Sequence, residues 1–234
     1  MGGEVRTRKL PFFPRFCGFT GRLIFRILLT RVRITGLEKI PQSGPVLAVF
    51  NHSSNSDGML LVAYVIPHFG RTFAWPGKAE ALRWPVLGYC MRQNGVFGVR
   101  RGASDLESFR VAKSVLDEGR ILAIFPEGTR SRTGAMQEAK PGATVLAVRS
   151  GAPVLPIAIV GSQRLWPRGA LLPRPLRRVE IHVGDTFTLS MPEDADRREA
   201  LRLATVELMR HIAEMLPPEQ RGVYAGTVER ETRA

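Results

Sequence analysis

His52 and Asp57 are the two side chains of this sequence whose types and spacing suit proton transfer. An imidazole can act as a base near neutral pH, and a carboxylate on its second nitrogen fixes its tautomer and orientation. Five positions apart on a regular helix, the two side chains would lie on different faces, so the chain must bend between them. Residues 53–56 read Ser-Ser-Asn-Ser, and these residues favour turns and helix caps. A structural His–Asp pair is the alternative interpretation.

A second polar group directly follows an apolar run that ends at Phe125. It combines a carboxylate, a glycine, a hydroxyl and a guanidinium, in the residues Glu127, Gly128, Thr129 and Arg130. This combination can bind a phosphate or a polyol. A charged turn without a ligand has the same composition, and the sequence alone leaves both interpretations open.

A third polar group, Arg100 and Arg101, ends another extended run. Taken alone, these arginines would be solvated surface residues. Ser53 and Ser54 raise the option of a serine nucleophile. However, no Gly-x-Ser-x-Gly elbow occurs anywhere in the chain, so the sequence gives that option no support.

The elements that must position these residues alternate between strand-like and helix-like runs. The predicted strands are residues 45–50, 71–75, 95–99, 120–125, 154–160 and 179–187. The predicted helices are residues 57–66 (ending at Pro67), 84–93, 104–118, 142–149 and 195–216. Near-continuous apolar strands between helices predict an α/β fold with a mainly parallel sheet flanked by helices. Sites gather at the carboxyl ends of such strands, where the polar groups lie.

The composition fits one domain with a strong basic excess. The chain has 234 residues, 44% of them hydrophobic, with 34 Lys and Arg against 21 Asp and Glu and a net charge of +13. This charge indicates a nucleic acid, an anionic membrane surface or an anionic substrate as partner. The two cysteines form no Cys-x-x-Cys pair, so no zinc site is predicted. No apolar stretch reaches the ~18–20 residues of a spanning helix.

The first 40 residues concentrate the basic charge, with nine Lys and Arg against two acids. Bulky apolar residues are interleaved with these arginines, a pattern typical of segments that lie on a membrane surface. The alternative is a helix packed on the core with a solvated basic face. Residues 164–178 hold a similar mixture, which also suits a proline-rich surface loop.

Three strings in this order resemble the glycerolipid acyltransferase family, best known for the 1-acyl-glycerol-3-phosphate acyltransferases. They are Asn51-His52 with Asp57, then Phe-Pro-Glu-Gly-Thr-Arg-Ser at 125–131, then Val-Leu-Pro-Ile-Ala-Ile at 154–159 with Gly161. The resemblance covers about residues 36 to 190. One further family block departs slightly, because two arginines stand where members usually have one. Arg101 is aligned with the family residue, and Arg100 remains the alternative.

The resemblance implies a role for each matching residue. His52 would take the proton of an acceptor hydroxyl, and Asp57 would orient the imidazole. The hydroxyl oxygen would attack the thioester of acyl-CoA or acyl-carrier protein directly, with that donor as co-substrate and with no metal or other cofactor. The residues implied to hold the glycerol-phosphate part of the acceptor are Arg101, Glu127, Gly128, Thr129, Arg130 and Lys140.

The implied acceptor is 1-acyl-glycerol 3-phosphate (lysophosphatidate), acylated at sn-2 to give phosphatidic acid. Another lysophospholipid, glycerol 3-phosphate or an amino or sugar lipid would be compatible with the same chemistry. A nucleic-acid-binding protein is suggested by charge alone, and no zinc, helix-turn-helix or RNP signature supports it, so we expect no nucleic-acid partner. A non-catalytic lipid-binding relative is disfavoured because His52 and Asp57 are both intact.

The predicted organisation has three parts. Residues 1–35 form a basic amphipathic membrane-associating segment, residues 36–217 form the acyltransferase α/β domain, and residues 218–234 form a C-terminal tail. We expect a peripheral or monotopic protein on the cytoplasmic face of an anionic membrane.

Overall fold

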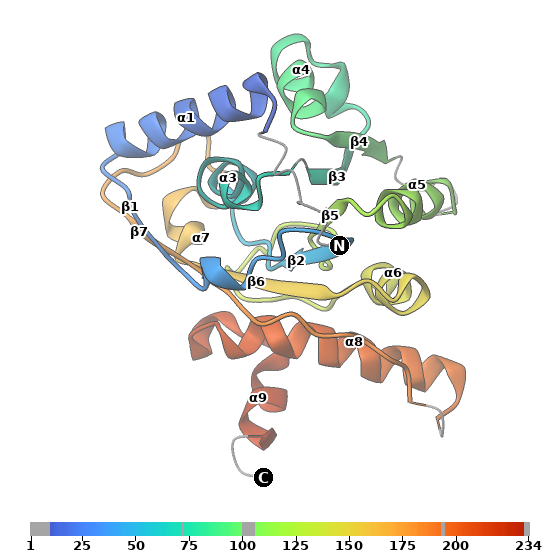
Figure 1. Ribbon diagram of the computed structural model, residues 1–234. Helices are drawn as coiled ribbons and strands as arrows, with labels where there is room; N and C mark the ends of the chain where they lie inside the picture. Colours follow the sequence, from blue (N-terminus) through green and yellow to red (C-terminus); the bar gives the residue numbers. More distant parts are fainter. Residues whose placement is uncertain (1–9, 72, 100–105, 193–194, 232–234) are drawn as a thin grey trace.

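The computed structural model describes residues 10–71, 73–99, 106–192 and 195–231 (Figure 1). Its strands are β1 Arg31–Thr35, β2 Val46–Phe50, β3 Phe73–Lys78, β4 Val96–Val99, β5 Ile121–Ile124, β6 Val154–Val160 and β7 Arg178–Val183. They form one seven-stranded sheet in the order β1-β7-β6-β2-β5-β3-β4. Every neighbouring pair is parallel except β6 and β7. The predicted α/β fold with a mainly parallel sheet is confirmed.

The helices cover both faces of this sheet (Figure 1). They are α1 Phe12–Ile27, α2 Asp57–Leu60, α3 Ile66–Phe69, α4 Pro85–Gln93, α5 Leu106–Asp117, α6 Gly142–Ser150, α7 Ser162–Leu165, α8 Arg197–Glu214 and α9 Ala225–Glu231. A π-helical segment, η2 Leu61–Val65, joins α2 to α3. The 3-10 turns are η1 Leu37–Lys39, η3 Ala81–Arg83, η4 Pro218–Gln220 and η5 Gly222–Tyr224.

The central strand β2 shows why the sequence reads as a continuous apolar run. All five of its residues are buried. Because side chains alternate along a strand, Phe50 packs in the core cluster with α1 and the α2–α3 unit, whereas Leu47 packs in the cluster with α5, α6 and α8. Both faces of the strand therefore need apolar residues, so apolar and polar residues do not alternate along its sequence.

The α2–α3 unit is longer than the sequence predicts. The predicted helix was expected to end at Pro67, but helical structure continues through Pro67 to Phe69, and Gly70 closes it with a φ of 60°. Proline is tolerated there because Pro67 lies in the first turn of α3, where a missing N–H costs little. The carbonyl of Ala63, four residues earlier, accepts a hydrogen bond from Arg22 Nη1 at 3.1 Å.

α1 forms a further layer outside the α2–α3 unit (Figure 1). Its contact face has small residues: a Cβ at Gly18 would lie 3.2 Å from the Val62 carbonyl oxygen, and one at Gly21 would lie 3.1 Å from Ala63 Cβ. The chain then enters the sheet directly, because β1 pairs with β7 from Arg31 onward. The sheet thus begins before residue 36, the predicted start of the α/β domain.

The C-terminal segment, which we expected to be a tail, packs on the domain over its described residues. Gln220, Tyr224 and Val228 are buried. The Met136 N–H donates to the Gln220 carbonyl at 2.9 Å, and the Ala139 N–H donates to the Tyr224 hydroxyl at 2.9 Å. This segment therefore contacts the loop that runs from β5 to α6. Of the helices described, none is both long and apolar enough to cross a membrane.

Candidate active site

The structure brings His52 and Asp57 together just beyond the end of β2. The imidazole Nδ1 lies 2.8 Å from Asp57 Oδ2. Asp57 is fully buried at the first position of α2, while the imidazole keeps 21% of its side-chain surface exposed. The chain bends through residues 53–56, as the turn-forming residues predicted. The buried carboxylate and the accessible ring are the arrangement that orients an imidazole toward solvent or substrate.

Asp57 Oδ2 also fixes the tautomer of His52. The same oxygen accepts hydrogen bonds from the backbone N–H groups of Ser53 at 2.9 Å and Ser54 at 2.8 Å. Because a carboxylate oxygen accepts from all three groups, Nδ1 carries a proton and the neutral imidazole has its lone pair on Nε2. His52 is therefore prepared to accept a proton at Nε2.

The serines of the bend are buried and bonded within it. Ser53 Oγ lies 3.0 Å from Ser162 Oγ, and Ser54 Oγ lies 2.8 Å from Ser56 Oγ. Ser54 Oγ also donates to the Trp166 carbonyl at 2.8 Å. These hydroxyls connect the bend to α7 and the residue after it, so their contacts are those of a turn.

The loop after β5 holds His52 from the other side. The His52 N–H donates to Glu127 Oε1 at 2.8 Å, and the His52 carbonyl accepts from the Ser131 N–H at 2.7 Å. The imidazole stacks on the ring of Phe125, with centroids 4.0 Å apart and planes inclined by 22°. The Phe-Pro-Glu-Gly-Thr-Arg-Ser string thus fixes both the main chain and the ring of His52.

Glu127 has both carboxylate oxygens engaged. Oε1 accepts from His52, and Oε2 accepts from the Gln137 N–H at 2.9 Å and from Gln137 Nε2 at 3.3 Å. The side chain is buried, and burial raises the pKa of this carboxyl, although the hydrogen bonds from His52 and Gln137 act in the opposite direction. These contacts make Glu127 a brace between the two polar segments.

Four other predicted residues lie on the accessible side of the same loop. Gly128 has a φ of 68°, and a Cβ there would come within 3.1 Å of Lys140 Cδ. The Lys140 N–H donates to the Pro126 carbonyl at 2.9 Å, which sets its side chain beside Gly128. Within the described residues, the guanidinium of Arg130 and the ammonium of Lys140 have no carboxylate partner, so both cations are available to an anion. Thr129 is half-buried, and its carbonyl accepts from Gln137 Nε2.

Arg101 and its alternative Arg100 lie outside the described residues, just after the end of β4 at Val99. The described residues also contain no group of three or more His, Cys, Asp or Glu arranged to hold a metal ion.

Several supporting residues escaped the prediction from sequence. The Asn51 side chain donates to the Ile159 carbonyl at 2.9 Å and accepts from the Ile159 N–H at 2.7 Å, which ties the end of β2 to β6. Asn51 belongs to the Asn51-His52 string of the family resemblance, but no role was predicted for it. Gln137 and Tyr224 act through contacts across 10 and 85 positions, for which the sequence holds no local pattern.

The sequence and the fold have known relatives. The family model described as Acyltransferase matches residues 31–160, which is more than half of the chain. The chloroplastic 1-acyl-sn-glycerol-3-phosphate acyltransferase LPAT1 of Arabidopsis thaliana is 30% identical over 180 residues, 74% of this chain and 49% of the plant protein. The chain thus spans about half the length of that relative.

Bacterial relatives match over more of their own length. The 1-acyl-sn-glycerol-3-phosphate acyltransferase of Pseudomonas aeruginosa is 29% identical over 206 residues, 84% of this chain and 77% of that protein. The crystal structure of the 1-acyl-sn-glycerophosphate (LPA) acyltransferase PlsC from Thermotoga maritima superimposes with a TM-score of 0.67 and 27% identity. That match covers 86% of this chain and 79% of the other.

Proposed function

The chain belongs to the acyltransferase family, and from this premise we propose that it moves a fatty acyl group from a thioester donor to the free sn-2 hydroxyl of 1-acyl-glycerol 3-phosphate. The product would be phosphatidic acid, and the donor would be acyl-CoA or acyl-carrier protein. The observation that carries the proposal is the His52–Asp57 pair, with its proton on Nδ1 and its free lone pair on Nε2.

The proposed reaction needs no covalent enzyme intermediate. His52 Nε2 takes the proton of the acceptor hydroxyl while that oxygen attacks the thioester carbonyl carbon. The tetrahedral intermediate then breaks its C–S bond, and the imidazolium returns the proton to the departing thiolate. Asp57 stabilises the imidazolium between these two steps. The new ester and the free thiol account for every atom and proton.

Acceptor recognition is assigned to the cations beside the base. Arg130 and Lys140 carry unpaired charges within the described residues and belong to the loop that braces His52. A guanidinium binds phosphate oxygens in a bidentate way, and an ammonium adds a point charge. We assign Gly128 and Thr129 to the same acceptor-binding surface, together with Arg101. Glu127 would act on the acceptor through His52, because its oxygens already accept three hydrogen bonds.

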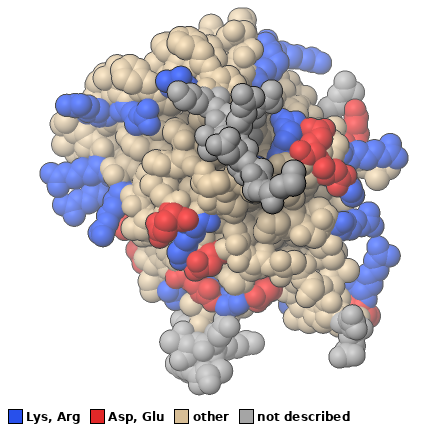
Figure 2. All heavy atoms as spheres, in the orientation of Figure 1, with Lys and Arg blue, Asp and Glu red and all other residues tan. Residues whose placement is uncertain are grey.

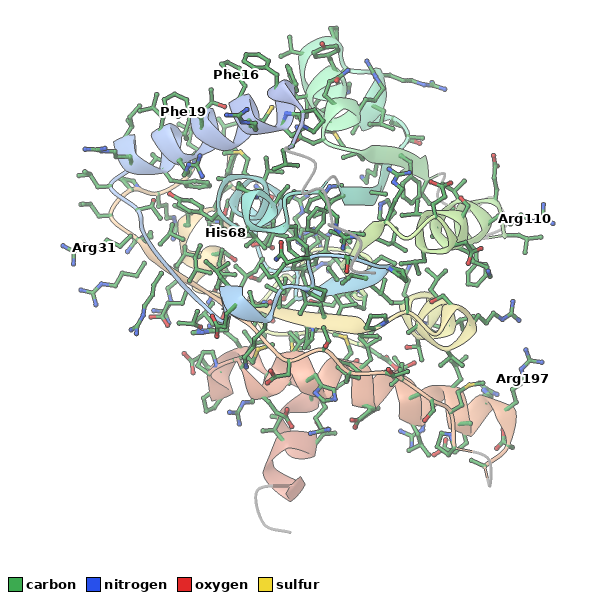
Figure 3. The ribbon with its side chains drawn as sticks, viewed as in Figure 1. Phe16, Phe19, Arg31, His68, Arg110 and Arg197 are labelled. Atoms are coloured by element: carbon green, nitrogen blue, oxygen red, sulfur yellow. The ribbon has the colours of Figure 1, made fainter. Side chains whose placement is uncertain are left out.

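Access to a lipid acceptor is assigned to an apolar surface on α1 and α4. On α1 the residues that are about half exposed or more are Phe12, Phe16, Phe19, Leu23 and Ile27. Trp84, Val86, Leu87 and Tyr89 extend this surface over α4 and the residue before it. The Phe13 and Tyr89 rings join the helices with centroids 5.2 Å apart. Phe16 and Phe19 point away from the molecule in Figure 3, and uncharged atoms make up much of this side in Figure 2, with Lys and Arg side chains beside them.

Such a large exposed apolar surface indicates a contact with protein or membrane. An amphipathic helix with basic flanks suits an anionic bilayer, so we assign a peripheral or monotopic position on the cytoplasmic face of the membrane. The test is co-sedimentation of Phe19→Asp with anionic vesicles. Losing a half-exposed Phe costs about 1 kcal/mol of partitioning, or about fivefold in affinity. Leu203→Asp on α8 is the control, and equal losses in both variants would refute this surface.

The reaction is tested by product identification. Purified protein is incubated with labelled acyl-CoA and, in parallel, lysophosphatidate, other lysophospholipids and glycerol 3-phosphate. Mass spectrometry should find phosphatidic acid as the main product, and Arg130→Ala should raise the KM for lysophosphatidate without changing the KM for acyl-CoA. Arg132→Ala is the matched control. A preferred acceptor without phosphate would overturn the assignment.

A further inference from the structure

A cavity of about 570 Å³ lies at the C-terminal end of α1, away from the His52 centre. Arg22 and Arg26 of α1 and Arg31 at the start of β1 line it, together with Tyr64 of η2. Lys and Arg side chains gather on this flank in Figure 2, and Arg31 projects outward from it in Figure 3. Its volume lies within the range of small-molecule sites.

The cavity is basic and has no acid in its lining. Within the described part of the chain, Arg26 and Arg31 have no carboxylate partner, and Arg22 bonds only to the carbonyl of Ala63. Thr30 also lines the cavity, and its buried hydroxyl has no hydrogen-bond partner among the described residues. The three guanidinium groups that line the cavity repel one another, and a bound anion reduces that repulsion.

The rim of the cavity is apolar and its backbone is unusual. Leu29 and Leu176 both line it, and these residues are 62% and 69% exposed. Both have a positive φ, 50° and 58°, which no other non-glycine residue described in this structure has. L-residues avoid this conformation. The fold therefore holds two leucines in water beside the arginines, an arrangement suited to a ligand with both an anionic and an apolar part.

The cavity also lies at the right depth for a membrane lipid. At about 100° per residue, Arg22 projects roughly a quarter turn away from the stripe of Phe12, Phe16 and Phe19, and Arg26 lies at the edge of that stripe, about 20° from Phe19. When the phenylalanine stripe faces the acyl region, this flank lies along the headgroups, where arginines place their charge.

The acceptor phosphate of the reaction cannot occupy this cavity. β1 lies three places from β2 in the sheet order, and strands are about 4.8 Å apart, so the two strands are about 14 Å apart across the sheet. Arg31 is further than this from the end of β2, because the register aligns Phe50 with Ile157 and Val183 but Arg31 with Arg178. The phosphate and the free hydroxyl of a lysophosphatidate are separated by only a few bonds. A phosphate held at Arg31 would leave the hydroxyl far from His52 Nε2.

We propose that the cavity bounded by Arg22, Arg26 and Arg31 binds the phosphate monoester headgroup of a second membrane lipid, whose acyl chains pass over Leu29 and Leu176. The proposal rests on the membrane-facing surface assigned above and is independent of acyl transfer. A monoester suits the cavity because its three terminal oxygens can each accept from a different guanidinium.

The test measures binding of the full chain to vesicles of phosphatidylcholine containing either phosphatidic acid or phosphatidylglycerol, at matched surface charge. The pocket variant is Arg26→Ala/Arg31→Ala, which leaves Arg22 and its structural bond intact. The control is Arg110→Ala/Arg197→Ala, which removes the same charge from exposed positions on α5 and α8, far from the cavity in Figure 3. At about fivefold per arginine, the pocket variant should bind phosphatidic acid vesicles about 30-fold more weakly, and the control much less.

A second variant keeps the charge and changes the rim. Leu176→Gly relieves the positive φ, so the fold should be retained, and it should weaken binding to phosphatidic acid vesicles several-fold. Equal losses for the pocket and control variants, or equal losses on both anionic lipids, would overturn the proposal. Competition by micromolar inorganic phosphate would indicate a free-phosphate site, and competition by CoA would indicate a donor site. Either result would refute assignment to a membrane lipid. No binding of the wild-type chain to any vesicle would refute the membrane-facing surface itself.

Discussion

Asp57 offers a sharp test of how the structure prepares His52, because three donors share a single oxygen of its carboxylate. In Asp57→Asn, the amide oxygen can take the place of Oδ2. The reverse orientation would set an NH2 group against the backbone N–H groups of Ser53 and Ser54. The asparagine oxygen should therefore still accept the proton of His52 Nδ1, and the productive tautomer should persist.

The expected loss of rate in Asp57→Asn is that of the charge alone. Its NH2 group also takes the buried place of Oδ1, which has no hydrogen-bond partner among the described residues, and this lowers stability. A hydrogen bond to a charged group contributes about 1.5–3 kcal/mol and a neutral one about 0.5–1.5 kcal/mol. The difference of about 1–1.5 kcal/mol lowers kcat by about 5- to 15-fold. Asp57→Ala removes the orienting oxygen as well, and the loss should reach on the order of 10³- to 10⁴-fold, as for an imidazole base in the wrong tautomer.

The assay is the initial rate of acyl transfer to lysophosphatidate in mixed micelles, with circular dichroism to confirm folding. Asp57→Ala leaves two buried N–H groups without an acceptor, which destabilises the fold by about 1–3 kcal/mol each, so rates are compared well below the melting temperature. Equal losses in the two variants would refute the fixed orientation of the amide. An Asp57→Asn rate equal to wild type would refute the role of the charge.

Two further predictions concern the brace around the site. Burial raises the pKa of Glu127 above its ordinary 4.5, so the folded state holds this proton more tightly than the unfolded chain. The stability that this proton contributes is present below pH 4.5 and is lost as the pH rises through the folded-state pKa. In urea unfolding, the free energy of unfolding of wild type should therefore rise relative to that of Glu127→Gln when the pH is lowered from 7 to 4. A fall in this difference would contradict the prediction. Tyr224→Phe removes the acceptor of the Ala139 N–H and should lower the melting temperature by about 2–4 °C for a loss of about 1 kcal/mol. It should also raise the KM for lysophosphatidate, because the same loop carries Arg130 and Lys140. Tyr89→Phe, which removes a hydroxyl at the exposed surface, should leave the melting temperature unchanged.

Local patterns in the sequence predicted the parts of the fold that depend on local chemistry. The apolar run before His52 indicated β2, and the small polar residues at 53–56 indicated the bend that brings Asp57 back to His52. The prediction that the helix ends at Pro67 was wrong because a missing N–H matters less in the first turn of a helix than in its interior. The sequence also does not mark the π-helical segment that precedes Pro67.

The remaining features depend on contacts between distant residues. β1 lies at the sheet edge, and its Arg-Val-Arg-Ile-Thr sequence looks like a continuation of the basic N-terminal segment until β7 pairs with it. Nothing in the sequence around Glu127 indicates that its carboxylate oxygens accept hydrogen bonds from His52 and Gln137. The C-terminal segment resembles a tail because its buried side chains, such as Tyr224, are few and widely spaced.

The most direct test of the account is the rate of acyl transfer by His52→Ala, measured with labelled acyl-CoA and lysophosphatidate and compared with wild type at equal concentrations of folded protein. A general base contributes about 10²- to 10⁴-fold, so the variant should fall to about one per cent of the wild-type rate or below while its melting curve stays cooperative. A folded His52→Ala protein that retains more than about a tenth of the wild-type rate would contradict the assignment of His52 as the base.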